Sequence, residues 1–228
     1  MAKRTIQPIE DSKKTVANIA RDRIRTAILE GVLPPGSRID QIQLAKDLNT
    51  SLVPVREALK KLESEGFVQI TPRRGAFVTN VSTEDMEDLY RARTLLEGEV
   101  AFAAAAHLTD KIIHQLEQCF NQMDAALHAG DFDTFSELNH RFHFLIYGAA
   151  GSKYLTNMIT SLWDLAERYR YRYVFFKDRS DMIQAEHRAI LDACRARDGH
   201  RLREAIVLHM NQTLHGLRSL VDHDRQKG

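Results

Sequence analysis

The chain has 228 residues, a formal net charge of +1, 43% hydrophobic residues and two cysteines. These values are typical of one or two globular domains and exclude a disordered, collagen-like or disulfide-built chain. No apolar run approaches the ~20 residues that cross a bilayer, and the first residues lack a signal-peptide core. We therefore expect a cytoplasmic protein with no membrane partner.

Charge and proline divide the chain near residue 80. Residues 1–80 hold 14 Lys and Arg against 9 Asp and Glu, whereas the other 148 residues hold 18 against 22. All five prolines also lie in the first part. We expect a mobile arm over residues 1–12, a small basic domain over 13–80 and a larger helical domain over 81–228.

The basic segment predicts three short helices followed by a β-hairpin. Apolar spacing places Val16, Ile19, Ile24, Ala27 and Ile28 mostly on one face of the first helix, and Ile42, Leu44, Ala45 and Leu48 on the inner side of the second. This order of elements is typical of a winged helix-turn-helix, whose third helix enters the major groove while the hairpin, or wing, reaches the neighbouring backbone. The predicted helices cover 13–30, 40–48 and 51–65, and the strands cover 67–71 and 76–79.

The third helix carries candidate DNA contacts. Leu52, Arg56 and Lys60 recur every fourth residue opposite the apolar stripe, and Val53 follows Leu52. Arg56 suits a guanine edge or a phosphate, while Leu52 and Val53 suit thymine methyl groups. A solvated, charged helix face would show the same spacing.

The hairpin turn adds two cations. Arg73 and Arg74 precede Gly75 at its tip. Cations on a projecting turn suit phosphate or a narrow minor groove. On charge alone a solvated basic loop explains them, but the ordered series of turn, helix, capped helix and basic hairpin favours contact with double-stranded DNA.

The proline-free part predicts six antiparallel helices in a bundle. Ser82-Thr83-Glu84-Asp85 has the form of a capping box and opens a helix that continues to Ala106. The overall fold class is therefore mainly α, with a winged helix-turn-helix followed by an all-helical bundle. Further helix starts lie at Thr109, Asp131, Ser152, near Ser180 and after Asp198.

Three of the ten histidines lie among apolar residues on predicted helices. Asn139 and His143 share one helix face at i, i+4, and His187 and His209 lie on two later helices. Three imidazoles and one oxygen donor would suit Zn, Ni, Mn or a similar divalent ion. Spacing alone favours separate core or interface histidines, since no H-x-x-x-H pair exists.

Several ordered motifs make the chain resemble the GntR-type transcription regulators. The helical part is similar to FCD, the ligand-sensing domain of the FadR subfamily. The resemblance implies a homodimer on a pseudo-palindromic operator, with Arg56 in contact with DNA and a small effector in the second domain. The motifs are GVLPPG at 31–36, LAKDL at 44–48, PVREAL at 54–59, EGFV at 65–68 and PRRGAFV at 72–78.

The same resemblance implies a metal site. FCD domains commonly hold a metal through the first residue and the His of an Asp/Asn-x-x-Phe-His motif, and through one His on each of two later helices. These positions fall on Asn139, His143, His187 and His209. Asn in place of Asp removes a negative ligand, so we expect a lower metal affinity and a larger role for an effector carboxylate.

Arg93 matches the arginine that the family places near its ligand pocket. Bidentate capture of a small carboxylate is chemistry that arginine suits. An ion pair with Glu97 at i, i+4 explains this arginine equally well.

One departure from the family concerns the operator. The family usually has Arg and then Thr where this chain has Leu52 and Val53. We expect an altered half-site, or a greater reliance on Arg56, Lys60 and the wing.

The sequence thus predicts a DNA-binding transcription regulator, a repressor controlled by a small organic acid in a metal-containing pocket, with no catalytic residues. The alternative is a metal-dependent hydrolase with an accessory nucleic-acid-binding domain, in which the histidines activate water. No acidic residue stands in the base position of an H-E-x-x-H motif, although Glu186 adjoins His187. A third interpretation is a purely structural metal in a domain that only dimerises.

Overall fold

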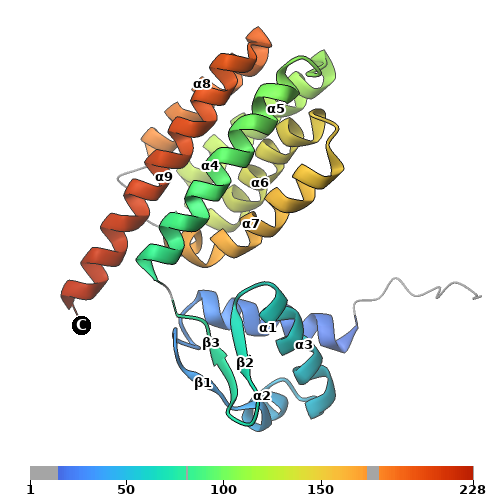
Figure 1. The fold of residues 1–228 in the computed structure, drawn as a ribbon, viewed down its shortest axis with the longest axis vertical. Helices are drawn as coiled ribbons and strands as arrows, with labels where there is room; N and C mark the ends of the chain where they lie inside the picture. Colours follow the sequence, from blue (N-terminus) through green and yellow to red (C-terminus); the bar gives the residue numbers. More distant parts are fainter. Residues whose placement is uncertain (1–14, 81, 174–179, 228) are drawn as a thin grey trace, which may run out of the picture. The chain divides into compact units, whose positions relative to one another are not determined.

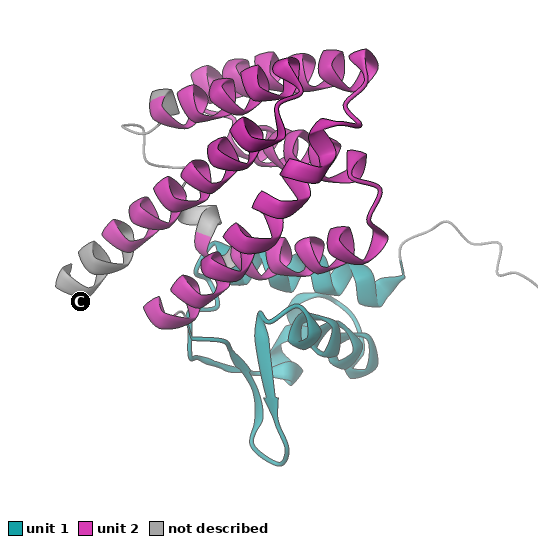
Figure 2. Cartoon of the chain, turned by 45° about the horizontal axis from the view of Figure 1, so that its top comes forward, with its two compact units in different colours: residues 1–80 teal, residues 81–228 magenta. Residues whose placement is uncertain are grey.

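The computed structural model describes residues 15–80, 82–173 and 180–227 (Figure 1). The chain divides into two compact units, 1–80 and 81–228, shown in teal and magenta in Figure 2. Over the described residues the first unit holds three helices and a small sheet, and the second holds six helices. The mainly helical fold class is confirmed. The arm expected over 1–12 lies outside the described residues.

The three helices of the first unit begin at short polar side chains. Asp40 accepts hydrogen bonds from the backbone N–H groups of Ile42 and Gln43, and Thr15 accepts one from Asn18. Ser51 occupies the N-cap position of the third helix, but its side chain makes no capping hydrogen bond. The helices are α1 (Val16–Leu29), α2 (Gln41–Asp47) and α3 (Leu52–Ser64).

The hairpin belongs to a three-stranded antiparallel sheet of order β1-β3-β2. Val68 pairs with Val78 and Ile70 with Ala76 across the wing. The third strand, in which Arg38 pairs with Phe77, was not foreseen because two residues carry no readable period. The strands are β1 (Arg38–Ile39), β2 (Val68–Thr71) and β3 (Gly75–Val78).

The inner face of α1 matches the prediction only in part, because Ile24 is buried as expected and Ile28 packs against the core. Val16 and Ile19 are 56% and 49% exposed, and the buried stripe is Ala17, Ala20 and Ile24. Alanines allow the α1 backbone to approach α3 closely, so the helix is rotated relative to its largest apolar residues. Ile42 of α2, also expected inside, is 60% exposed.

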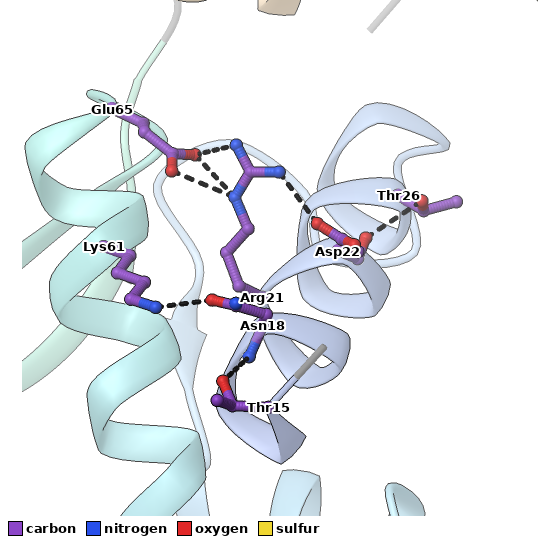
Figure 3. A network of polar contacts seen from close by, with 7 residues as sticks. All are labelled: Thr15, Asn18, Arg21, Asp22, Thr26, Lys61 and Glu65. Carbon is purple, nitrogen blue, oxygen red and sulfur yellow. Dashed lines mark hydrogen bonds and ion pairs between the residues drawn. The ribbon is translucent and has the colours of Figure 1, made fainter. Parts of the chain in front are cut away.

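Polar contacts join α1 to the end of α3 (Figure 3). Arg21 donates from Nε and Nη2 to the Glu65 carboxylate at 2.7–3.0 Å, and from Nη1 to Asp22 at 2.8 Å. One turn away, Lys61 Nζ donates to Asn18 Oδ1. Because Arg21 is only partly exposed, its forked bond to Glu65 fixes the C-terminal end of α3 against α1.

Replacing Arg21 with alanine should lower the free energy of unfolding by about 1 kcal/mol, because the variant loses a partly buried, charge-assisted bond. Urea unfolding followed by circular dichroism measures this change. Arg23→Ala, at an exposed position of the same helix, is the control. Equal stabilities of the two variants would show that the Arg21–Glu65 contact contributes nothing.

Six long helices form the second unit. Ser82, Thr109 and Asp131 cap three of them by accepting the N–H of the third following residue, as the sequence predicted. Packing of α4 along α9 is close at Gly98, where an added Cβ would lie 3.1 Å from Val207. The helices are α4 (Thr83–Ala105), α5 (Asp110–Ala129), α6 (Phe132–Ala149), α7 (Lys153–Tyr173), α8 (Ser180–Ala196) and α9 (Gly199–Lys227).

The core of the second unit is continuous and has Trp163, Tyr90 and Tyr147 among its largest fully buried aromatic side chains. Within the described residues, no helix is long and apolar enough to cross a membrane.

Candidate functional site

The outer face of α3 carries most of the predicted DNA contacts. Val53 is 64% exposed, and Arg56 and Lys60 are exposed one and two turns further along the helix. Leu52 differs from the prediction, because it is half-buried and packs against the core of the first unit. A side chain held by the core has less reach toward a base, so the apolar surface of α3 near Arg56 is supplied by Val53.

Arg56 is held by a neighbouring helix. Its Nε donates to Oε1 of Gln41 at 3.3 Å. Gln41 is the first residue of α2, directly after the capping Asp40, whose pKa is lowered by hydrogen bonds from the backbone N–H groups of Gln43 and Ile42. The bond to Gln41 leaves the two terminal amino groups of Arg56 able to face a partner. Gln41 could not be predicted as a partner of Arg56, since 15 residues separate the two.

A third cation, which sequence reasoning missed, lies beside the two arginines of the wing. Arg73 and Arg74 are exposed, with Arg73 at φ 63° and Gly75 at φ 110°. A Cβ built on Gly75 would lie 3.4 Å from Nε of Arg38, so this exposed guanidinium lies over the glycine. Arg38 pairs with Phe77, two residues along β3 from Gly75, so its side chain reaches along the strand to the base of the wing turn.

If the wing binds phosphate, Arg38→Ala should weaken DNA binding equally for all sequences. It should also reduce the slope of log Kd against log salt by about 0.9, the value for one lost phosphate contact. Fluorescence anisotropy of a labelled duplex at several salt concentrations measures the slope. Arg201→Ala, an exposed arginine of the second unit, should leave the slope unchanged. An unchanged slope for Arg38→Ala would exclude this role.

Three buried histidines from three helices converge in the second unit. His143 of α6, His187 of α8 and His209 of α9 are each less than 10% exposed, and one nitrogen of each lies within 4.8 Å of the others. Their ring centroids are 4.8–5.4 Å apart. The structure thus brings together three side chains that the sequence placed on separate helices.

Each of these imidazoles is oriented through Nδ1. Nδ1 of His187 donates to the carbonyl of Ile183 at 2.8 Å, and that of His209 to the Glu186 carboxylate at 2.7 Å. The hydroxyl of Tyr147 donates its hydrogen bond to Glu97. Its oxygen is therefore left to accept a hydrogen bond from Nδ1 of His143 at 3.1 Å. These partners assign the lone pair of every ring to Nε2, the pattern found around metal-ligating histidines.

The chemistry of this donor set fits a divalent cation. Burial, and then the electrostatic effect of the neighbouring His209, lower the pKa of His187 to about 3, so its imidazole is neutral at pH 7. Its Nε2 lies 2.7 Å from Oδ1 of Asn139. Two lone pairs this close are favourable only with a cation or a proton between them, or with the amide turned over. Nitrogen and oxygen donors of this kind suit Zn, Ni or Mn.

Arg93 lies near the middle of α4, and only 1% of its surface is exposed. Its Nε donates to Oε1 of Glu97 at 2.6 Å, so the ion pair considered from the sequence is present. The guanidinium also lies 4.6 Å from the centre of the Trp163 ring. Among the described residues, Nη1 of Arg93 has no hydrogen-bond partner. A buried N–H group of a cation without an acceptor suits an anionic ligand.

Tyr147 connects the arginine to the histidines. Its hydroxyl donates to Oε2 of Glu97 at 2.6 Å and accepts from His143, so a chain of hydrogen bonds runs from Arg93 to the first histidine. Trp163 contacts both ends, since its ring centroid lies 5.3 Å from that of His143. Sequence reasoning missed Tyr147, whose only signal was its i+4 spacing from His143.

Comparison with protein families identifies both units. Residues 17–78 match the model described as bacterial regulatory proteins, gntR family, and residues 88–212 match the FCD domain. The chain belongs to the GntR family of bacterial regulatory proteins and carries an FCD domain. GntR-family proteins are transcription regulators that bind DNA, and they are not enzymes. The hydrolase alternative therefore has no support.

Known relatives agree with this family. The GntR-family chain is 29% identical to the HTH-type transcriptional repressor RspR of Escherichia coli over 197 residues, 86% of each protein. It is 25% identical to the regulator YdhC of Bacillus subtilis over 90% of this chain and 92% of that protein. The solved structure of E. coli McbR/YncC covers 92% of this chain and all of its own, with 23% identity and a TM-score of 0.76.

The other histidines whose side chains the structure describes are exposed and do not belong to the cluster. His140, next to Asn139 in sequence, is exposed and stacks on Phe144 with ring centroids 4.0 Å apart. The side chain of His223 lies outside the described residues. His107, His114, His128, His200 and His215 are exposed.

Proposed function

We propose that this GntR-family protein is a cytoplasmic repressor that binds a pseudo-palindromic operator as a homodimer. We further propose that a small carboxylate, bound beside a divalent metal ion in the FCD domain, controls its affinity for DNA. The observation that carries the proposal is the convergence of three oriented imidazoles next to the buried Arg93. The relative RspR is described as a repressor, which supports repression as the outcome.

Asn139, His143, His187 and His209 would hold the metal. All four are buried, and the three imidazole rings have Nδ1 held by an acceptor. FCD domains are often metal-binding. When bound, the metal would supply positive charge and an open position for a carboxylate oxygen.

Arg93 would bind the same anion from the other side. Glu97 already engages Nε, and Nη1 remains for a ligand oxygen. Because Glu97 compensates the charge of the arginine, an added carboxylate needs a second cation to be stable in this buried place. The metal supplies it, which explains why one site would combine an arginine with a metal centre.

The DNA-binding surface would consist of exposed residues of α3 and the wing. Val53, Arg56 and Lys60 face away from the core, whereas half-buried Leu52 contributes little. Each protomer would supply one recognition helix. The effector would change operator affinity only if it binds two orientations of the dimer with different affinity. The wing residues are Arg73, Arg74 and Gly75.

Elemental analysis of purified protein, followed by thermal unfolding with mono-, di- and tricarboxylates, tests the proposal. We expect about one divalent ion per chain and an increase in Tm with one class of acid. The increase in Tm should be lost in Arg93→Lys, because lysine keeps the positive charge but lacks the planar guanidinium that binds a carboxylate through two N–H groups. Metal-free protein that keeps the acid response would contradict the shared site.

Operator binding separates regulation from a purely structural metal. If removal of the metal lowers Tm while no carboxylate changes operator affinity, the second unit is only a dimerisation module. A carboxylate that shifts operator affinity of metal-loaded protein, and not of stripped protein, supports the proposal.

A further inference from the structure

We propose that Ile42 of α2 and Val53 of α3 form an apolar pair beside Arg56 that reads the C5-methyl groups of thymines in the operator half-site. The inference rests on operator binding by α3 and goes further by naming the base chemistry and by adding a residue of α2 to the interface.

Both side chains are exposed in a small unit that buries most of its apolar residues. Ile42 is 60% exposed and Val53 is 64% exposed. Each lies in the first turn of its helix, Ile42 after Gln41 and Val53 after Leu52. Branched apolar side chains in these positions gain nothing in the free protein, so they are available to an apolar partner.

Their position relative to Arg56 follows from the contacts of the first unit. Gln41, the chain neighbour of Ile42, accepts the hydrogen bond from Nε of Arg56 at 3.3 Å. Val53 precedes Arg56 by three residues, a spacing that puts two side chains on one side of a helix. Each of the two helices thus carries an exposed apolar residue in its first turn: Val53 on the same side of α3 as Arg56, and Ile42 next in sequence to the residue that Arg56 contacts.

The occupant of this surface is set by its charge. Arg56 and Lys60 are exposed on α3, so the partner is an anion that also presents apolar groups. The major groove of DNA combines these features, because phosphates flank it and the thymine methyl is its exposed apolar group. Guanine offers O6 and N7 to Arg56, and thymines on either side of that base would meet Ile42 and Val53.

Leu52 does not take this role. The sequence pattern assigned thymine contact to Leu52 and Val53, but Leu52 packs against the core. Ile42, which periodicity placed inside, is exposed instead. Ile42 thus takes the exposed place that the sequence pattern assigned to Leu52. The first turns of α2 and α3 together still expose two apolar side chains, whereas the family usually has Arg and Thr at the positions of Leu52 and Val53.

The experiment uses the full-length protein and deoxyuridine. Bound sequences are first selected from a pool of random duplexes of about 30 base pairs, enough for two half-sites one helical turn apart. Each thymine of the selected half-site is then replaced by deoxyuridine, which removes only the methyl group. Anisotropy at fixed salt gives Kd for the wild type, Ile42→Ala and Val53→Ala.

We expect deoxyuridine at two positions to raise the wild-type Kd about fourfold each, the value for one buried methyl-sized group. Ile42→Ala should be insensitive at one of these positions and Val53→Ala at the other. Val32→Ala, with a side chain 69% exposed in the same unit, should behave like the wild type. All three variants should keep the wild-type Tm because the side chains are exposed.

Two results overturn the inference: no position at which deoxyuridine weakens binding, or two variants that both keep the full wild-type sensitivity. Arg56→Ala separates this failure from failure of the DNA-binding assignment. If Arg56→Ala loses the selected duplex while deoxyuridine has no effect, only the methyl contacts are wrong. If Arg56→Ala binds as well as the wild type, the assignment of α3 is wrong as well.

Discussion

Arg56→Ala is expected to weaken binding to the operator duplex by about 10- to 100-fold, the value of one bidentate arginine–guanine contact. Arg56 is exposed, and its contact to Gln41 is a single hydrogen bond of 3.3 Å, so the fold should be unaffected. Anisotropy titrations against the operator and against a scrambled duplex measure the loss. The ratio of the two affinities should fall, because a base contact carries sequence information.

Lys60→Ala is the matched control on the same face of α3. A lysine that contacts phosphate should lower affinity for both duplexes by the same factor and leave their ratio unchanged. An Arg56→Ala protein that keeps nanomolar affinity and the wild-type ratio would remove Arg56 from the recognition surface. A variant with a lowered Tm would instead attribute the loss to folding.

Local signals explain why the elements were predictable. A side-chain acceptor at the N-cap position stabilises a helix start, and Asp40, Ser82 and Asp131 each bond an N–H group within three residues in sequence. The absence of proline from the second part, which favours long uninterrupted helices, can likewise be read from the local sequence. Since both signals are short in range, the helices of both units could be predicted nearly to the residue.

Rotation of the helices was harder to predict than their bounds. Val16, Ile19 and Ile42 were expected inside because they are large and apolar, but the packed stripe of α1 consists of alanines and Ile24. Periodicity gives the width of an apolar face and not the distance at which two helices meet. For the same reason the sequence pattern predicted Leu52 on the outer face of α3, although it packs against the core.

Orienting contacts of the histidine cluster could not be predicted because they span the chain. Glu186 and His209 are 23 residues apart, Asn139 and His187 are 48 apart, and Glu97 and Tyr147 are 50 apart. Only the tertiary fold brings such pairs together. The ligand residues themselves came from the resemblance, since spacing alone favoured separate core histidines.

His187→Ala and His209→Ala should each abolish bound metal, because each removes one of three imidazoles within 4.8 Å of one another. Elemental analysis measures occupancy after purification. His140→Ala, an exposed histidine beside Asn139, should keep full occupancy. Since His187 is fully buried, its loss also leaves a cavity, so chelator treatment of the wild type provides the comparison without a cavity.

Wild-type protein from which a chelator has removed the metal should unfold at a lower temperature than the metal-loaded protein. A ligand present at 100 times its Kd stabilises the folded state by about 2.7 kcal/mol, and that stabilisation disappears with the metal. The Tm of His187→Ala should be the lower of the two, and added metal should restore only the wild type. Full occupancy in both histidine variants would exclude the site.

Glu186→Gln distinguishes a metal centre from a group of packed histidines. The carboxylate accepts from Nδ1 of His209 at 2.7 Å and so fixes Nε2 as the ligand atom. Loss of such an orienting partner usually lowers metal affinity 10- to 100-fold while the ligand set stays complete. Graded loss, with Glu186→Gln between the wild type and His209→Ala in a competition titration, is expected only if His209 binds metal through Nε2. Equal affinities for Glu186→Gln and the wild type would show that this contact has no effect on the metal.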